Sequence, residues 1–171
     1  MLAIIKKELK TYFLTPIGWT YIGIFLTLCS LFFFTDIFRY KTSAFSDIFG
    51  VTISTLTVLI PILTMRTFSE ERKNGTDQLL LTSPRSIKEI VLGKFLGATI
   101  VVLISALLTF VYYLILLYFG KPELITTLNV LIGYILISLV YISIGIFCSS
   151  LTENQIIAAV LSVGILLILS T

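Results

Sequence analysis

The chain has 171 residues, of which 57% are hydrophobic and only 12% are Asp, Glu, Lys or Arg. A soluble domain has roughly 45–50% apolar and about 25% charged residues, so this chain has half the usual share of charge. This composition excludes a cytosolic enzyme, a disulfide scaffold, a nucleic-acid-binding module and a disordered tail. It predicts an all-α, polytopic membrane protein whose surroundings are the lipid bilayer.

Residues 1–16 precede the first apolar run and are predicted to form a short interfacial amphipathic helix. One arc of that helix holds Leu2, Ile5, Leu9, Tyr12 and Phe13, with Lys6, Lys7 and Lys10 beside it. Such a helix lies in the headgroup plane and turns its lysines toward anionic phosphates. It is either a general interfacial anchor or a lever that links a cytoplasmic partner to the first span.

Five uncharged runs follow, and each is long enough to enter a bilayer, because a helix needs about 20 apolar residues to cross roughly 30 Å of hydrocarbon. Lipid offers no water to the backbone N–H and C=O groups, so each run is expected to be helical. The predicted spans are 17–38, 48–66, 90–119, 126–151 and a last one that begins near 155. We therefore expect a single transmembrane domain over 1–171, a helical bundle of about five spans, with the last span truncated at 171.

The second predicted span carries small and hydroxylated residues on one face. Within about 80° of a helical wheel lie Gly50, Ser54, Thr57, Pro61 and Thr64. Residues of this kind mark helix packing, and a proline kinks its helix. The same face would also suit the lining of a transport pathway, and both interpretations stay open. On the third span, Gly93 and Gly97 form a small-xxx-small pair that predicts close helix packing.

The long polar segment at 66–94 holds ten of the charged residues. Residues 66–73 are expected to continue the second span's helix, and Asn74-Gly75 to end it, because glycine enters the left-handed conformation without steric cost. A short second helix is predicted at about 76–82, capped by Thr76 and Asp77 and stopped before Pro84. The third span's helix begins with a capping-box pattern, Ser86-x-x-Glu89.

The predicted helix at 76–82 carries three successive leucines, Leu79, Leu80 and Leu81. Burying each is worth roughly 1.5–3 kcal/mol, so leaving them in water is costly. Three consecutive helical residues cannot face one surface. Either all three pack on the chain's own helix ends and the bilayer interface, or one side inserts into a partner's groove.

The basic residues predict the orientation. If the N-terminus is cytoplasmic, the inner segments 1–16, 67–94 and 151–155, together with Arg66, hold nine Lys and Arg residues. The outer loops then hold three, namely Arg39, Lys41 and Lys121. This positive-inside bias predicts a cytoplasmic N-terminus in a multi-pass protein of the cell membrane.

The sequence lacks the residues that catalysis, metal binding, ATP binding and ion coupling usually need. Histidine is absent, which removes the commonest general base and nitrogen ligand, and Cys29 and Cys148 are isolated in different apolar runs. No Gly-x-x-x-x-Gly-Lys-(Ser/Thr) motif occurs. No span has a carboxylate near its middle, as ion-coupled carriers usually need. We expect no catalytic residue, cofactor or metal on this chain, and we expect the energy for transport to come from outside it. The alternative functions are a secondary carrier, a channel and a non-transporting structural subunit.

Four stretches of the sequence carry motifs that are informative when they are taken together. Lys-Lys-Glu-Leu-Lys-x-Tyr-Phe-x-(Thr/Ser)-Pro-x-Gly lies at 6–18, and Met-Arg-x-x-x-Glu-Glu-Arg-x-x-Gly-Thr-x-x-Leu-Leu-Leu-Thr-x-Pro lies at 65–84. Leu-Gly-Lys-Phe lies at 92–95, and Ser-Leu-Thr-Glu-Asn-Gln-x-x-Ala lies at 150–158. Together they resemble the permease subunit of ABC-2 type ABC transporters, in the branch with the gliding-motility and nitrous-oxide-reductase-maturation permeases.

The resemblance implies export of an unidentified substrate by two six-span permease subunits, identical or related, and a separate cytosolic ATPase that holds ATP and magnesium. It also implies a connecting helix at 1–16 and a coupling helix in the loop 67–94. The ATPase-docking residues that it implies are Glu70, Glu71, Arg72, Gly75, Thr76, Leu79, Leu80, Leu81 and Pro84. The end of the chain within the fifth predicted span departs from the six-span pattern.

Overall fold

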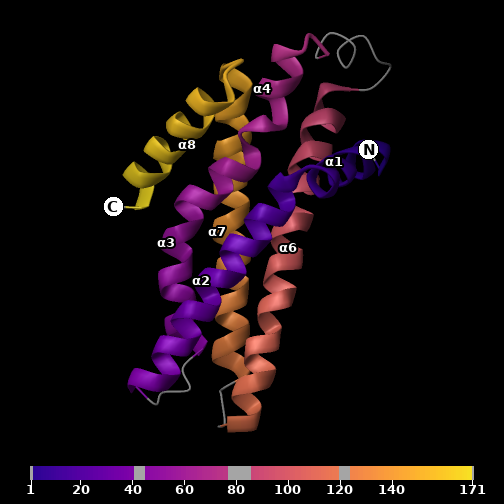
Figure 1. Cartoon of the computed structure of the whole chain (residues 1–171). Helices are drawn as coiled ribbons and strands as arrows, with labels where there is room; N and C mark the ends of the chain where they lie inside the picture. The colour runs from indigo at the N-terminus through magenta and orange to yellow at the C-terminus, as the bar shows by residue number, and fades with distance from the viewer. Residues whose placement is uncertain (1, 41–44, 77–85, 120–123, 171) are drawn as a thin grey trace.

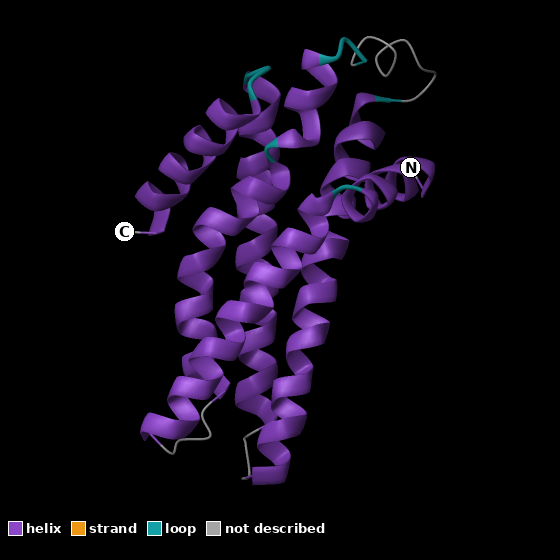
Figure 2. Cartoon of the chain, in the orientation of Figure 1, coloured by secondary structure: helices purple, strands orange, loops and turns teal. Residues whose placement is uncertain are grey.

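The computed structural model describes residues 2–40, 45–76, 86–119 and 124–170, and the side chains of these residues except 36–53 and 119. Within these ranges the regular structure is entirely helical (Figure 2). The helices are α1 (Leu2–Leu14), α2 (Pro16–Tyr40), α3 (Phe45–Thr64), α4 (Arg66–Lys73), α6 (Ile87–Phe119), α7 (Leu124–Leu151) and α8 (Gln155–Ser170).

Four long helices, α2, α3, α6 and α7, run along the same axis and form the bundle (Figure 1). The helix α8 packs on the outside, against α3 and α7. The helices α1 and α4 lie at one end, where α1 crosses obliquely to the bundle and packs on α6. The described part of the chain is therefore a membrane-type helical bundle with two short helices gathered at the same end.

The helices coincide with the predicted spans. Among the described residues, three stretches are long and apolar enough to cross a membrane, namely Pro16–Thr35, Ile87–Tyr118 and Leu124–Leu151. The 20-residue α3 occupies the place of the predicted second span, and the 16-residue apolar α8 that of the fifth. The expected all-α membrane bundle is confirmed.

The interior of the bundle is held by aromatic rings and hydroxyl groups. Tyr21, Phe25 and Tyr134 are buried, and the rings of Phe25 and Tyr134 lie 5.4 Å apart. The Tyr134 hydroxyl lies 3.3 Å from that of Tyr21 and 3.2 Å from that of Ser105. These contacts join α2, α6 and α7, and they satisfy hydroxyl groups that lipid cannot solvate.

The polar face predicted on the second span lies largely inside the chain's own fold. Thr57, Pro61 and Thr64 are buried, Ser54 is exposed, and the surroundings of Gly50 lie outside the described side chains. Any side chain at Gly145 of α7 would clash with the hydroxyl oxygen of Thr64. This end of α3 therefore packs tightly on α7, while a role of the face in a transport pathway stays a prediction.

Candidate functional site

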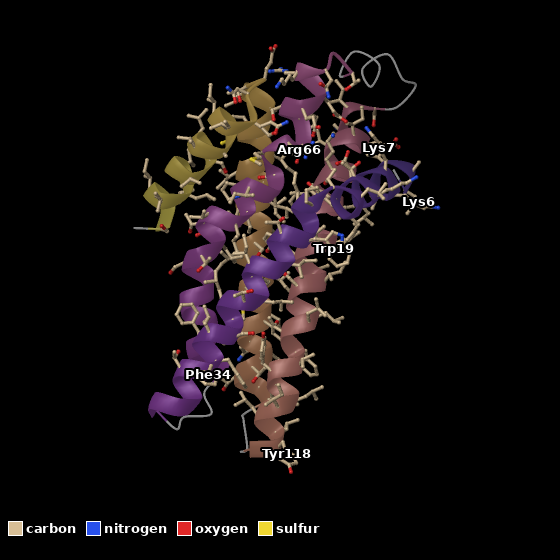
Figure 3. The ribbon with its side chains drawn as sticks, in the orientation of Figure 1. Lys6, Lys7, Trp19, Phe34, Arg66 and Tyr118 are labelled. Atoms are coloured by element: carbon tan, nitrogen blue, oxygen red, sulfur yellow. The ribbon has the colours of Figure 1, made fainter. Side chains whose placement is uncertain are left out.

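Basic side chains gather at the end of the bundle that carries α1 and α4, which we call the basic end. Every described Lys and Arg side chain comes from α1, from α4 or from α6 up to Lys94. Figure 3 shows Lys6, Lys7 and Arg66 at this end and Phe34 and Tyr118 toward the other. The short helices α1 and α4 and the described basic side chains therefore lie at the same end of the bundle.

Lys94 is the centre of a buried ion cluster. Its side chain is charged but only 2% exposed. Its Nζ donates to Oε1 of Glu8 at 3.1 Å and to the carbonyl oxygen of Thr67 at 2.7 Å. It also lies 2.8 Å from Oε2 of Glu71, an ion pair whose angles do not fit a hydrogen bond. One ammonium group of α6 therefore holds a carboxylate of α1 and a carboxylate of α4.

The rest of the cluster neutralises and covers this ammonium group. Lys7 donates to Oε1 of Glu71 at 2.9 Å, which forms a second link between α1 and α4. The Lys94 Nζ lies 4.9 Å from the centre of the Phe68 ring, at a distance typical of a cation–π contact. Two lysines and two glutamates balance each other, so the buried ammonium of Lys94 is compensated.

Two glycines allow α1 to approach α6 closely enough for this pairing. A Cβ atom on Gly97 would lie 2.8 Å from Cβ of Glu8, and one on Gly93 would lie 2.7 Å from Cγ2 of Ile4. Real Cβ atoms do not come so close. The predicted close packing at Gly93 and Gly97 is confirmed, and its partner is α1.

Further contacts fasten α1 to α4 and to α2. The buried Tyr12 hydroxyl lies 3.4 Å from Oγ1 of Thr67, and burial raises the pKa of the Tyr12 phenol, so that it stays protonated. The indole N–H of Trp19 donates to the carbonyl oxygen of Phe13 at 2.9 Å. The helix α1 is therefore bonded to the protein along one side.

Arg66 and Glu70 pair within α4 itself. Nε of Arg66 donates to Oε2 of Glu70 at 2.6 Å, and Nη2 donates to Oε1, which makes the pair bidentate. These hydrogen bonds raise the pKa of the Arg66 guanidinium. Glu70 thus stabilises its own helix, whereas Glu71 connects α4 with its neighbours.

The expectation that 66–73 continues the helix of the second span needs a correction. The helix α3 ends at Thr64, and α4 begins at Arg66. At the break, the Ser149 hydroxyl of α7 accepts from the backbone N–H groups of Phe68 (3.0 Å) and Ser69 (3.2 Å) and donates to the carbonyl oxygen of Met65 (3.0 Å). A side chain inserted into a helical hydrogen-bond ladder interrupts the helix.

The other end of α4 forms as predicted. Gly75 follows the helix with φ +66° in the left-handed region. The backbone N–H of Gly75 bonds the carbonyl of Arg72, and that of Thr76 bonds the carbonyl of Glu71. These are the two bonds of a Schellman motif. The Thr76 hydroxyl also donates to the carbonyl of Glu71 at 3.2 Å, so Thr76 closes α4.

At the start of the third span, the serine half of the predicted capping box is present. Oγ of Ser86 accepts from the backbone N–H of Glu89 at 3.3 Å, as an N-cap serine does. The helix α6 begins at Ile87 and so includes the last residues of the predicted loop 67–94.

Of the predicted docking residues, the structure describes Glu70, Glu71, Arg72, Gly75 and Thr76. The leucines, Pro84 and residues 77–82 of the predicted helix lie outside the described residues, so docking through them stays a prediction.

The sequence did not reveal the partners that hold α4, which are Lys7, Lys94 and Ser149, or Glu8, which pairs with Lys94. One signal for Lys94 was available, since it is the last charge before the uncharged run at 95–120 and could have been expected to need a partner at the membrane boundary.

A cleft of about 310 Å³ between α1 and α4 opens onto the ion cluster, and both Glu8 and Lys94 line it. Within the described ranges, no three His, Cys, Asp or Glu side chains come together as metal ligands. The site is therefore a set of links between helices, and its chemistry is that of ion pairs and hydrogen bonds.

Comparisons with known proteins give the family. No curated protein and no solved structure matches the chain. The family described as ABC-2 family transporter protein matches residues 2–171, which is nearly the whole length. With its helical membrane bundle, this chain belongs to the ABC-2 family of transporter proteins.

Proposed function

We propose that the chain is the membrane-spanning permease subunit of an ABC exporter. A separate cytosolic ATPase holds ATP and magnesium, and a second permease subunit completes the pathway. The basic end faces the cytoplasm of the cell membrane, because basic residues favour that side. Family membership supports the permease role, and ABC-2 permeases work with ATPase subunits.

The observation that carries this proposal is the contact of Lys94 with both α1 and α4. A displacement of α4 would be transmitted through this ammonium to α1 and to the long helix α6. The hydrogen bonds of Ser149 would transmit it to α7 at the same time. Energy delivered at one short helix would thus reach several spans.

The described docking residues divide into two groups under this proposal. Glu70 stabilises α4 through its pair with Arg66, and Glu71 holds α4 in place through its ion pairs with Lys7 and Lys94. Arg72, Gly75 and Thr76 are exposed beside the segment with the three leucines. Gly75, Thr76 and the leucines would contact the ATPase, whereas Arg72 lines a groove between α4, α6 and α7.

Co-purification with the cognate ATPase subunit tests the docking site. Replacing Leu79, Leu80 and Leu81 with alanine should abolish the complex, because the apolar contact would be lost. The matched control replaces Leu167, Ile168 and Leu169 of α8 with alanine and should leave the complex intact. A complex of normal yield with the first variant would contradict the assignment.

Nucleotide hydrolysis by the reconstituted complex tests the transmission step. Lys94→Met should still bind the ATPase but reduce the permease-dependent part of ATP hydrolysis several-fold. Lys88→Met, an exposed lysine of the same helix, should behave as the wild type. If the rate of ATP hydrolysis does not depend on the permease and an ion gradient drives transport, the secondary carrier would be favoured instead.

A further inference from the structure

A groove of about 450 Å³ lies between α4, α6 and α7 at the basic end, on the other side of α4 from the ion-cluster cleft. Its walls are apolar, formed by Phe68, Ile87, Ile90, Val91, Ile146 and Phe147. Its size is within the range of about 300–1,000 Å³ that is usual for ligand sites.

Most of the polar groups on the groove have partners within the protein. The hydroxyls of Ser143 and Ser150 donate to carbonyl groups of their own helix, at 2.9 and 2.7 Å. The Glu71 carboxylate is paired with Lys94 and Lys7. Both serine hydroxyls thus donate within the protein, and the charge of Glu71 is compensated by the two lysines.

Arg72 is the exception. It lines the groove, is exposed and has no carboxylate partner among the described residues. Since the nearby cluster of two lysines and two glutamates is neutral as a whole, Arg72 gives the groove a net positive charge. An anionic group is the complement of this guanidinium, and guanidinium groups bind phosphate in a bidentate manner.

The position of the groove indicates that an apolar group occupies it together with the anionic group. It extends along α7 from Ser150 to Ser143, a length of about 10 Å at 1.5 Å per helical residue. This is one end of a membrane-spanning helix, at the level of the interfacial helix α1. Ile87 is 66% and Phe147 is 60% exposed here, a cost in water but not against an acyl chain.

We propose that this groove binds an anionic phospholipid, with its phosphate on Arg72 and one acyl chain along the apolar walls of α6 and α7. Apolar walls that run into the membrane and end at a cation without a carboxylate partner among the described residues match both parts of such a lipid. Basic pockets between transmembrane helices bind anionic headgroups on the same principle. The proposal concerns this chain alone and does not depend on an ATPase.

Photocrosslinking tests the site on the purified full chain. Nanodiscs of phosphatidylcholine would contain a small fraction of phosphatidylglycerol with a photoreactive group on one acyl chain. We expect crosslinks in the peptides 87–91 and 143–150. Arg72→Gln should reduce the labelling about tenfold, as expected for the loss of a hydrogen-bonded charge. Lys73→Gln, which removes the neighbouring exposed cation outside the groove, should leave it unchanged.

A second probe and a second variant make the result specific. The same photoreactive group on phosphatidylcholine should label the groove weakly. Val91→Trp should fill the groove and reduce labelling by both lipids. Equal labelling by the two lipids, or equal labelling of Arg72→Gln and Lys73→Gln, would overturn the proposal. So would complete protection of the groove by the ATPase subunit, which would assign it to a protein partner.

Discussion

Lys94 is a single cation that meets two carboxylates away from water. The exposed fractions of the side chains are 2% for Lys94, 8% for Glu8 and 13% for Glu71. Removing one partner of a buried pair costs roughly 3–5 kcal/mol, mainly because the remaining charge is left without compensation. This lysine therefore matters for the stability of the basic end as well as for the proposed transmission.

A double-mutant cycle measures that coupling. Lys94→Met should lower the free energy of unfolding by roughly 3–5 kcal/mol. Adding Glu8→Gln should recover part of the loss, because it removes the carboxylate that Lys94→Met leaves stranded, whereas Glu71 keeps its pair with Lys7. Lys88→Met is the control and should stay within about 0.5 kcal/mol of the wild type. Thermal unfolding in detergent gives the values, and strictly additive losses would contradict the pairing.

Gly97 is a second residue-scale test, because a methyl group there would collide with Cβ of Glu8. Gly97→Ala should destabilise the protein by about 1–3 kcal/mol through overpacking, in spite of the better helix propensity of alanine. Gly133→Ala is the matched control, since a Cβ at Gly133 meets no atom within 4 Å. The control should be neutral or slightly stabilising, and equal effects of the two changes would show that α1 does not pack here.

At the scale of elements, α4 is the helix whose position needs most explanation. It has 8 residues, fewer than the roughly 12–15 that an isolated helix needs to be even marginally stable in water. Ser149 satisfies two backbone N–H groups at its start, and the Schellman motif at Gly75 closes its end. The helix is therefore held from outside, by α7 at its start and by Lys7 and Lys94 through Glu71.

Replacing Ser149 tests this arrangement. Ser149→Ala should leave the N–H groups of Phe68 and Ser69 without an acceptor and cost about 1–3 kcal/mol. Ser138→Ala on the same helix is the control, because the buried Ser138 hydroxyl donates only to the carbonyl of Tyr134. Hydrogen exchange at residues 65–69 should accelerate in the first variant and not in the second. Unchanged exchange would contradict the role of Ser149.

For the whole molecule, the decisive property is the uneven distribution of basic residues along the sequence: nine Lys and Arg residues belong to the segments predicted to face the cytoplasm, and three, Arg39, Lys41 and Lys121, belong to the outer loops. The end of the bundle opposite the basic end carries apolar and aromatic residues such as Tyr118, which is 87% exposed. Cationic side chains are costly inside a bilayer and are retained on the cytoplasmic side. The orientation that we propose follows from this asymmetry.

Cysteine labelling in intact cells measures the orientation. Tyr118→Cys should react with a membrane-impermeant maleimide, whereas Lys73→Cys should react only after the cells are permeabilised. The native Cys29 and Cys148 are buried and serve as the background control. The opposite pattern would place the basic end outside and contradict the proposed ATPase contact.

The positions of the helices were predictable because lipid leaves the chain little choice. An uncharged run must form its hydrogen bonds within itself, so the runs became α2, α3, α6, α7 and α8. The end of α4 at Gly75 and the start of α6 at Ser86 were also predictable from the sequence. Their signals depend on residues only a few positions apart.

The break at Met65 and the ion cluster arose only in the folded chain. Glu8 and Lys94 are separated by 86 positions in the sequence, and Ser149 acts on backbone groups 80 and 81 positions away. No local pattern specifies such partners, because they depend on which faces of the helices meet. The close approach at Gly97 brings α1 onto α6, and only then do the two glutamates share one lysine.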